Sequence, residues 1–114
     1  MSDIGFNQFY HYSQTFTAAG DGAIHDLRIN PCQTFSVQVG ATGGTPTLWN
    51  VVLEGSLDGT NFSTILSHTS ANLGLNSIIG TGNQVFPCTY IRIKVVTLTL
   101  GIATSITVNI AGLD

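Results

Sequence analysis

The sequence predicts an all-β protein that folds as a single antiparallel β-sandwich, most simply a jelly roll. Apolar and polar residues alternate along most of the chain, which is the period-two pattern of half-buried strands. Clusters of glycine, proline, asparagine and aspartate interrupt this pattern roughly every ten residues, as turns do in sandwiches. No stretch shows the sustained three- and four-residue apolar spacing of an amphipathic helix. Eight or nine short strands are therefore expected.

Four segments carry the clearest alternation. Their apolar sets are Phe35, Val37 and Val39; Trp49, Val51 and Leu53; Ile91, Ile93 and Val95; and Ile106, Val108 and Ile110. Leu48 and Val52 add apolar residues in the opposite phase to Trp49, which predicts a strand that is partly buried on both faces. The apolar phase flips at Val95-Val96 and continues through Val96, Leu98 and Leu100. Such a one-residue flip predicts a β-bulge with Val96 facing inward.

Weaker patterns place the remaining strands and the two cysteines. Further strands are expected at Tyr12–Ala18, Ala23–Ile29, Asn61–Thr69 and Leu75–Ile79. Cys32 and Cys88 each follow a proline and open a strand. Two partly buried thiols are expected in a reducing compartment, and a disulfide closing the long loop between them is the alternative.

The chain divides into residues 1–12, an N-terminal arm or a first strand, and residues 13–114, the β-sandwich domain. The first sixteen residues hold half of the aromatic residues, namely Phe6, Phe9, Tyr10, Tyr12 and Phe16. Their rings either fill the core from a first strand or dock on a neighbouring subunit, since aromatic residues are enriched in interface cores. The glycine-rich loop Gly40–Pro46 is the second expected contact element. The candidate interface residues are Phe6, Phe9, Tyr10, Tyr12, Thr42 and Thr45.

The charge content excludes several classes of partner. Only 8% of the residues are charged, the net charge is −3 and the three basic residues are scattered. An ordinary soluble domain carries about 25% charged residues, so this surface suits contact with another protein. No nucleic acid is expected, because nothing provides a basic footprint for phosphates. No membrane is expected either, because Arg92 and Lys94 interrupt the longest apolar stretch, and the N-terminus lacks the pattern of a secretion signal.

No residue pattern names a reaction, a cofactor or a metal. The sequence lacks the Gly-x-Ser-x-Gly nucleophile elbow. Glu54 and Asp58 could form an acid–base pair, but an outward strand position and a turn explain them better. Asp58 and Asn61, or Asp21 and Asp26, could offer oxygen ligands to calcium, but neither set lies in an EF-hand or RTX pattern. A site formed by His11 and His25 has no more support. We therefore expect no enzyme, no cofactor and no bound metal.

A carbohydrate-binding function remains an alternative. Sugar sites use an aromatic platform beside amide or carboxylate groups, and Trp49-Asn50 or the run Tyr10, His11 and Tyr12 could supply one. Trp49 shares the phase of Val51 and Leu53, so core packing is the stronger interpretation of its ring.

The segment from Val51 to Phe62 is the most specific motif. A strand leads through Glu54-Gly55-Ser56 into a tight turn at Asp58-Gly59, and Phe62 is expected to return to the core beside Leu53 or Leu57. This hairpin resembles a segment of β-sandwich virion proteins from tailed bacteriophages, and also of discoidin-like sandwiches.

Together with small size, low charge and the aromatic N-terminal segment, the motif makes the chain similar to the phage capsid decoration, or cement, proteins. The resemblance implies a homotrimer that is made in the host cytoplasm, binds the major capsid protein on the outer capsid surface and stabilises the shell. It carries over no catalytic or binding residues. A tail or fibre subunit and a carbohydrate-binding sandwich acting in host attachment are the alternatives.

Overall fold

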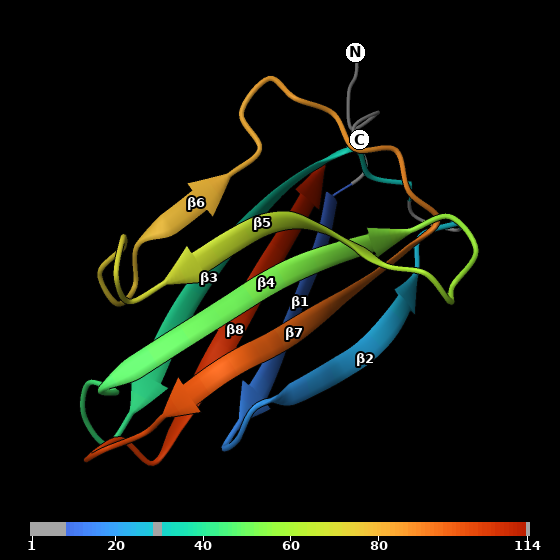
Figure 1. Cartoon of the computed structure of the whole chain (residues 1–114). Coiled ribbons are helices and arrows are strands. Elements are labelled where there is room, and N and C mark those ends of the chain that lie inside the picture. The colour runs from blue at the N-terminus through green and yellow to red at the C-terminus, as the bar shows by residue number, and fades with distance from the viewer. Residues whose placement is uncertain (1–8, 29–30, 114) are drawn as a thin grey trace.

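The computed structural model describes residues 9–28 and 31–113 of the chain, which form strands and no helix (Figure 1). The strands are β1 (Phe9–Phe16), β2 (Gly20–Asp26), β3 (Thr34–Thr42), β4 (Leu48–Ser56), β5 (Ser63–Thr69), β6 (Ile78–Gly80), β7 (Tyr90–Thr99) and β8 (Ser105–Leu113). Within these described residues there is accordingly no helix that could cross a membrane.

The strands form two four-stranded antiparallel sheets that face each other (Figure 1). The first, here called the β1 sheet, has the order β1-β8-β3-β6, and the second, the β2 sheet, has the order β2-β7-β4-β5. The pairs β1–β8, β2–β7, β3–β6 and β4–β5 show that the chain folds as one long hairpin rolled into a sandwich. The pairs β3–β8 and β4–β7 complete the two sheets. This is the strand order of a jelly roll, so the predicted fold class is confirmed.

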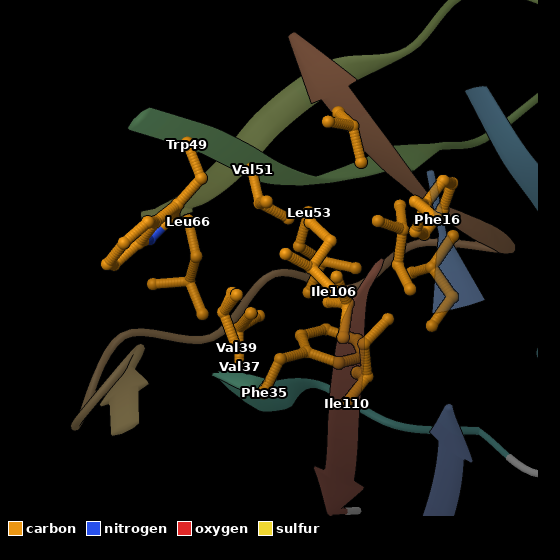
Figure 2. Close-up of a cluster of buried hydrophobic side chains, with 14 of the residues drawn as sticks. Phe16, Phe35, Val37, Val39, Trp49, Val51, Leu53, Leu66, Ile106 and Ile110 are labelled. Carbon is orange, nitrogen blue, oxygen red and sulfur yellow. The ribbon is translucent and has the colours of Figure 1, made fainter. Parts of the chain in front are cut away.

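The core lies between the two sheets and is built from alternate residues of the central strands (Figure 2). β3 contributes Phe35, Val37 and Val39, and β8 contributes Ile106, Val108 and Ile110. β4 and β7 supply the facing layer, with Trp49, Val51, Leu53, Ile91, Ile93 and Val95. Burying each of these side chains contributes about 1.5–3 kcal/mol, which explains why the period-two pattern of the sequence located the sheets.

The bulge predicted from the phase flip is present in β7. The ladder between β4 and β7 shifts register there, because Val51 pairs with Val95 and Asn50 pairs with Thr97. Val96 is therefore the extra residue, and it is 45% exposed rather than inward as the sequence suggested. The bulge turns the extra residue outward and returns Leu98 to the inner face.

β4 is buried on both faces, as predicted. Val52 and Ser56 point away from the core and are nevertheless buried. Phe62 differs from its prediction: it packs over the outer face of the β2 sheet, where its ring centre lies 4.1 Å from the Arg92 guanidinium carbon. The turn swings Phe62 past the sheet edge, and an aromatic ring stacked on arginine is a favourable alternative to core burial.

The boundaries of the weaker strands also differ from the sequence pattern. β1 begins at Phe9 rather than at Tyr12, and β2 spans Gly20–Asp26 rather than Ala23–Ile29. β5 begins at Ser63, and β6 is reduced to Ile78–Gly80. These strands lie at sheet edges, where one neighbour is missing and the burial pattern that guides prediction is weakest.

Two other sequence expectations concern the N-terminal segment and the cysteines. Residues 9–12 belong to β1, the first-strand alternative, and the division after residue 12 falls inside this strand; residues 1–8 lie outside the described residues. Cys32 and Cys88 precede β3 and β7 and are thiols rather than a disulfide. Burial, and then the nearby Cys32, raise the pKa of the half-buried Cys88 thiol.

Candidate interaction surface

The charged side chains are segregated to one sheet. Every charged residue within 9–28 and 31–113 lies in the strands of the β2 sheet or in the turns that adjoin them. These residues are Asp21, Asp26, Arg28, Glu54, Asp58, Arg92 and Lys94. The β1 sheet carries none. One broad face of the sandwich is therefore neutral, and the other holds the charge.

Most charges of the β2 sheet are already paired. Arg92 Nε donates to Glu54 Oε1 at 2.8 Å across the β4–β7 ladder, and Arg92 Nη1 lies 3.5 Å from Asp21 Oδ2 on β2. Arg28 forms a two-bond contact with Asp26, through Nε at 2.9 Å and Nη2 at 2.6 Å. The pairing with Arg28 lowers the pKa of the Asp26 carboxyl. These pairs neutralise much of the charge where it lies.

The outer face of the β1 sheet presents hydroxyl, amide and small side chains. Its outward residues are His11, Ser13 and Thr15 from β1; Ser105, Thr107, Asn109, Ala111 and Leu113 from β8; Thr34, Ser36, Gln38 and Gly40 from β3; and Ile78 and Gly80 from β6. We call this set the neutral face. Two shallow grooves of about 440 Å3 and about 240 Å3 cross it, and both include Ser36 and Ala111.

Hydrogen-bonding groups on the neutral face are only partly used. Gln38 Nε2 donates to the backbone oxygen of Asn76 at 2.9 Å, and the hydroxyls of Thr15 and Thr107 lie 3.3 Å apart. The side chain of Asn109, at the centre of the face, makes no hydrogen bond with other described residues. Small residues around it let another backbone approach closely. This arrangement suits recognition of a neutral polar partner.

The candidate interface residues near the N-terminus do not share one environment. Phe6 lies outside the described residues, and Phe9 begins β1 although its side chain is not described. Tyr10 and Tyr12 point inward, are half-buried and pack against the core. The structure thus gives their rings the core-filling position that was one of the two alternatives.

Tyr10 and Tyr12 pack with His25 between β1 and β2, the edge strands on one side of the sandwich. The Tyr10 hydroxyl lies 2.5 Å from His25 Nδ1, and the Tyr12 and His25 ring centres are 3.6 Å apart. Tyr12 also donates to Gln14 Oε1 at 2.7 Å. Burial raises the pKa of both tyrosines and lowers the pKa of His25. The cluster links β1 to β2 and is structural in character.

Thr42 and Thr45 lie far from Tyr10 and Tyr12. Thr42 ends β3 opposite Ser105, whereas Tyr10 is opposite Gly112, seven positions along β8. Seven residues of antiparallel strand span about 24 Å. Both threonines are exposed, and the neighbouring loop offers Ile102, whose exposure is 80%. The described part of the N-terminal contact element and the glycine-rich loop therefore lie at opposite ends of the sandwich.

The residues considered for catalysis or metal binding are occupied by structural contacts. Glu54 is buried against Arg92. The Asp58 carboxylate accepts hydrogen bonds from the backbone of Asn61 and Thr60, each at 2.8 Å, and from Asn61 Nδ2 at 2.8 Å. These bonds hold the pKa of Asp58 well below its usual range. No group of three histidine, cysteine, aspartate or glutamate side chains gathers in the part of the chain that the structure describes.

The other proposed combinations are also separated or covered. His11 points outward from β1 into the groove of the neutral face, whereas His25 lies inside the edge of the sandwich. Trp49, considered as a sugar platform, is only 4% exposed and belongs to the core (Figure 2). Its indole therefore offers no surface to a sugar. A third groove, of about 520 Å3, lies between the β4–β5 turn and residues 85–88, with Leu57 and Val85 exposed at its rim.

The sequence missed the neutral face because its members come from four strands that are far apart in the chain. Alternation identified the polar phase of β3 and β8 correctly, but not which strands share a sheet. The available signal was the position of the charges: among residues 9–28 and 31–113, they fall only in the segments that form β2, β4 and β7 and in the adjoining turns. The strand order is needed as well, because it shows that the strands without charges share one sheet.

The fold and the neutral face together define a jelly-roll module with one uncharged broad side. No family model and no curated protein sequence matches the chain. Among solved structures, it is similar to the SPBc2 prophage-derived protein YomS, with a TM-score of 0.61 and 13% identity over 100% of both chains. It is also similar to the Yersinia pseudotuberculosis-derived mitogen, with a TM-score of 0.54 and 12% identity over 94% of this chain and 86% of that one. At these identities the similarity shows the fold alone.

Proposed function

We propose that this protein is a non-enzymatic virion structural protein that binds a phage capsid shell as a decoration protein. The observation that carries the proposal is the segregation of charge between the two sheets. Burying a charged group in an interface costs desolvation energy unless it is paired, whereas a neutral polar face needs only hydrogen-bond partners. The neutral face is accordingly the side that we assign to the capsid.

Two further observations support the phage context. The hairpin from Val51 to Phe62 resembles a segment of tailed-phage virion proteins, and Asp58 holds its turn through four hydrogen bonds. A prophage-derived protein has a similar fold over its full length. Fold similarity does not transfer a role, so the assignment to the capsid depends on the surface.

The mechanism of the proposed function is mechanical. Hydroxyl and amide groups of the neutral face would hydrogen-bond to the major capsid protein, and small residues such as Ala111 would let the surfaces meet closely. The β2 sheet would face solvent, with the acids of its strands, Asp21, Asp26 and Glu54, paired to arginine. A homo-oligomer would strengthen attachment, because linked copies bind a repeating lattice with increased avidity. The proposed location is the capsid surface.

The test places one charge at the centre of the neutral face. Asn109→Lys puts an ammonium group on β8 without removing a hydrogen bond between described residues. Ser67→Lys is the matched control, because Ser67 is exposed on β5 in the other sheet. Binding of each purified protein to capsids that lack it would be measured by co-sedimentation.

The proposal expects wild type and Ser67→Lys to saturate capsids, and Asn109→Lys to bind about tenfold or more weakly, equivalent to about 1.4 kcal/mol. Equal binding by both lysine variants would show that the neutral face is not the surface that binds the capsid. No binding by the wild type, together with a glycan-array signal that Asn109→Lys removes, would instead support the carbohydrate alternative.

A further inference from the structure

Three of the four sheet edges carry features that discourage pairing with another strand. An edge strand exposes unpaired backbone groups, and natural proteins protect such edges with bulges, charges or short strands. β2 has a bulge between Asp21 and Ile24, and Gln14 Oε1 caps the backbone N–H of Ala23 at 3.1 Å. β5 has a register shift opposite Leu53 and Glu54. β6 is only three residues long.

β1 lacks all of these protections. It pairs with β8 over eight consecutive positions without a shift in register. Its sequence, Phe-Tyr-His-Tyr-Ser-Gln-Thr-Phe, contains no proline, glycine or formally charged residue at neutral pH. Its far side has no strand neighbour among the described residues. A long, regular and uncharged edge of this kind is a template for strand addition.

The direction of the backbone N–H and C=O groups along β1 can be worked out from β3, because β8 lies between these two strands. The Phe35 N–H donates to the hydroxyl oxygen of Thr81 at 3.1 Å, and the Phe35 C=O accepts from the Thr81 N–H at 2.9 Å, which places both backbone groups of Phe35 on the β6 side. In antiparallel sheets this direction alternates along each strand. Even-numbered residues of β3 therefore direct their backbone N–H and C=O toward β8. The odd-numbered residues of β8 opposite them direct theirs toward β3.

The same alternation carries across β8 to β1. The even-numbered residues of β8, such as Ile110, direct their backbone N–H and C=O toward β1, where they pair with even-numbered residues such as Tyr12. The backbone N–H and C=O of His11, Ser13 and Thr15 consequently point away from β8, at the free edge. Their side chains lie on the neutral face, so a strand added there would meet no charge on that face.

We propose that β1 pairs antiparallel with β1 of a second copy of this chain about a two-fold axis. The partner is a second copy because the described residues offer one unprotected edge, and a two-fold axis lets that edge meet itself and closes the assembly. Among the described residues, the two acids of the neighbouring edge strand β2, Asp21 and Asp26, are already paired with Arg92 and Arg28. Two copies therefore approach with little charge repulsion.

The pairing would join the two β1 sheets into one eight-stranded sheet. Its order would be β6-β3-β8-β1 followed by the same strands of the partner in reverse. The two neutral faces would become one continuous uncharged surface. The dimer does not depend on capsid binding, and it replaces the three-fold symmetry expected from the family resemblance with a two-fold axis.

The test compares two substitutions at Ser13. Ser13→Pro removes the N–H that points outward and leaves the ladder to β8 intact, since proline is tolerated at edge positions whose N–H is not bonded. Ser13→Ala removes the hydroxyl but keeps the N–H, so it is the matched control. Light scattering at several concentrations should give twice the 12.0 kDa chain mass for wild type and Ser13→Ala. Ser13→Pro should dissociate with a Kd raised about tenfold or more.

Amide hydrogen exchange identifies the surface directly. The amides of His11, Ser13 and Thr15 should be protected in the wild-type dimer and should exchange rapidly after dilution to monomer. If Ser13→Pro does not fold, Ser13→Lys replaces it, because an edge lysine also opposes strand addition. A wild-type monomer or trimer, or a dimer that Ser13→Pro or Ser13→Lys leaves intact, would overturn the inference. A dimer that fails to bind capsids would refute only the proposed function.

Discussion

Trp49 and His68 share a hydrogen bond inside the β2 sheet, with Trp49 Nε1 donating to His68 Nδ1 at 3.0 Å. His68 Nε2 donates in turn to the backbone oxygen of Ser77 at 2.8 Å. Both rings are buried, and the two bonds fix the histidine as the neutral tautomer with its proton on Nε2. The indole therefore completes a polar chain that leads from β4 through β5 to the segment before β6.

Trp49→Phe is expected to lower the free energy of unfolding, because it breaks the hydrogen bond from Trp49 to His68. The substitution removes the donor and leaves buried His68 Nδ1 without a partner, which costs about 1–3 kcal/mol, with a further loss from the smaller ring. Urea unfolding of Trp49→Phe, His68→Asn and the double variant would form a double-mutant cycle. Strict additivity of the two losses would contradict energetic coupling through the bond.

The sequence located the core and the bulge because both depend on local alternation. Val37, Val39, Val108 and Ile110 face inward as their phase requires, and the flip at Val95-Val96 marks the shift in register. The inward position expected for Val96 was wrong, because a bulge has one extra residue whose side the pattern cannot assign.

The features that define the surface depend on contacts between distant strands. Phe62 was expected in the core, but Arg92, thirty positions away, provides a ring-stacking partner outside it. The charge segregation needs the strand order β2-β7-β4-β5, and the free edge of β1 needs the order of both sheets. Periodicity indicates which residues face inward, but it does not give strand neighbours.

Stability should decrease as the solution is acidified through the range in which histidine titrates. Burial lowers the pKa of His25 below its ordinary 6.5, so the unfolded chain binds the proton more readily than the folded protein. The free energy of unfolding is then lost as the pH falls below about 6.5 and levels off below the folded pKa. Thermal unfolding of wild type and His25→Gln between about pH 7.5 and pH 5 would measure this effect.

The variant should show a flatter profile, because glutamine retains a polar partner for Tyr10 but does not titrate. Profiles of equal slope for the two proteins would show that His25 does not cause the pH dependence.

The Asp58 carboxylate should remain ionised in acid. Backbone hydrogen bonds from Asn61 and Thr60, and then side-chain bonds from Asn61 and Ser56, hold the pKa of Asp58 well below 3.8. Its contribution to stability is present above the unfolded pKa of about 3.8 and is lost as the pH falls through the lower folded value. Carboxyl carbon shifts would follow its titration by NMR. A midpoint near 3.8 would show that the turn does not hold the carboxylate.

Arg92→Lys is expected to destabilise the β2 sheet although it keeps the charge. Arg92 uses Nε to bind Glu54 and its guanidinium plane to cover Phe62, and lysine has neither the planar fork nor the stacking surface. Glu54 is only 8% exposed, so a weakened partner leaves an incompletely compensated buried carboxylate. A loss of about 1–3 kcal/mol is expected. Lys94→Arg, on the same face of β7, is the control and should be nearly neutral.

The same pair can be tested from the acidic side. Glu54→Gln keeps the shape of the side chain and removes the charge, so Arg92→Lys should cost less in that background if the arginine acts mainly through Glu54. If the loss is unchanged, the stack on Phe62 is the dominant contribution, and Phe62→Leu should then reproduce it. Urea unfolding of these variants distinguishes the ion pair from the stacked ring as the interaction that covers the outer face of β4.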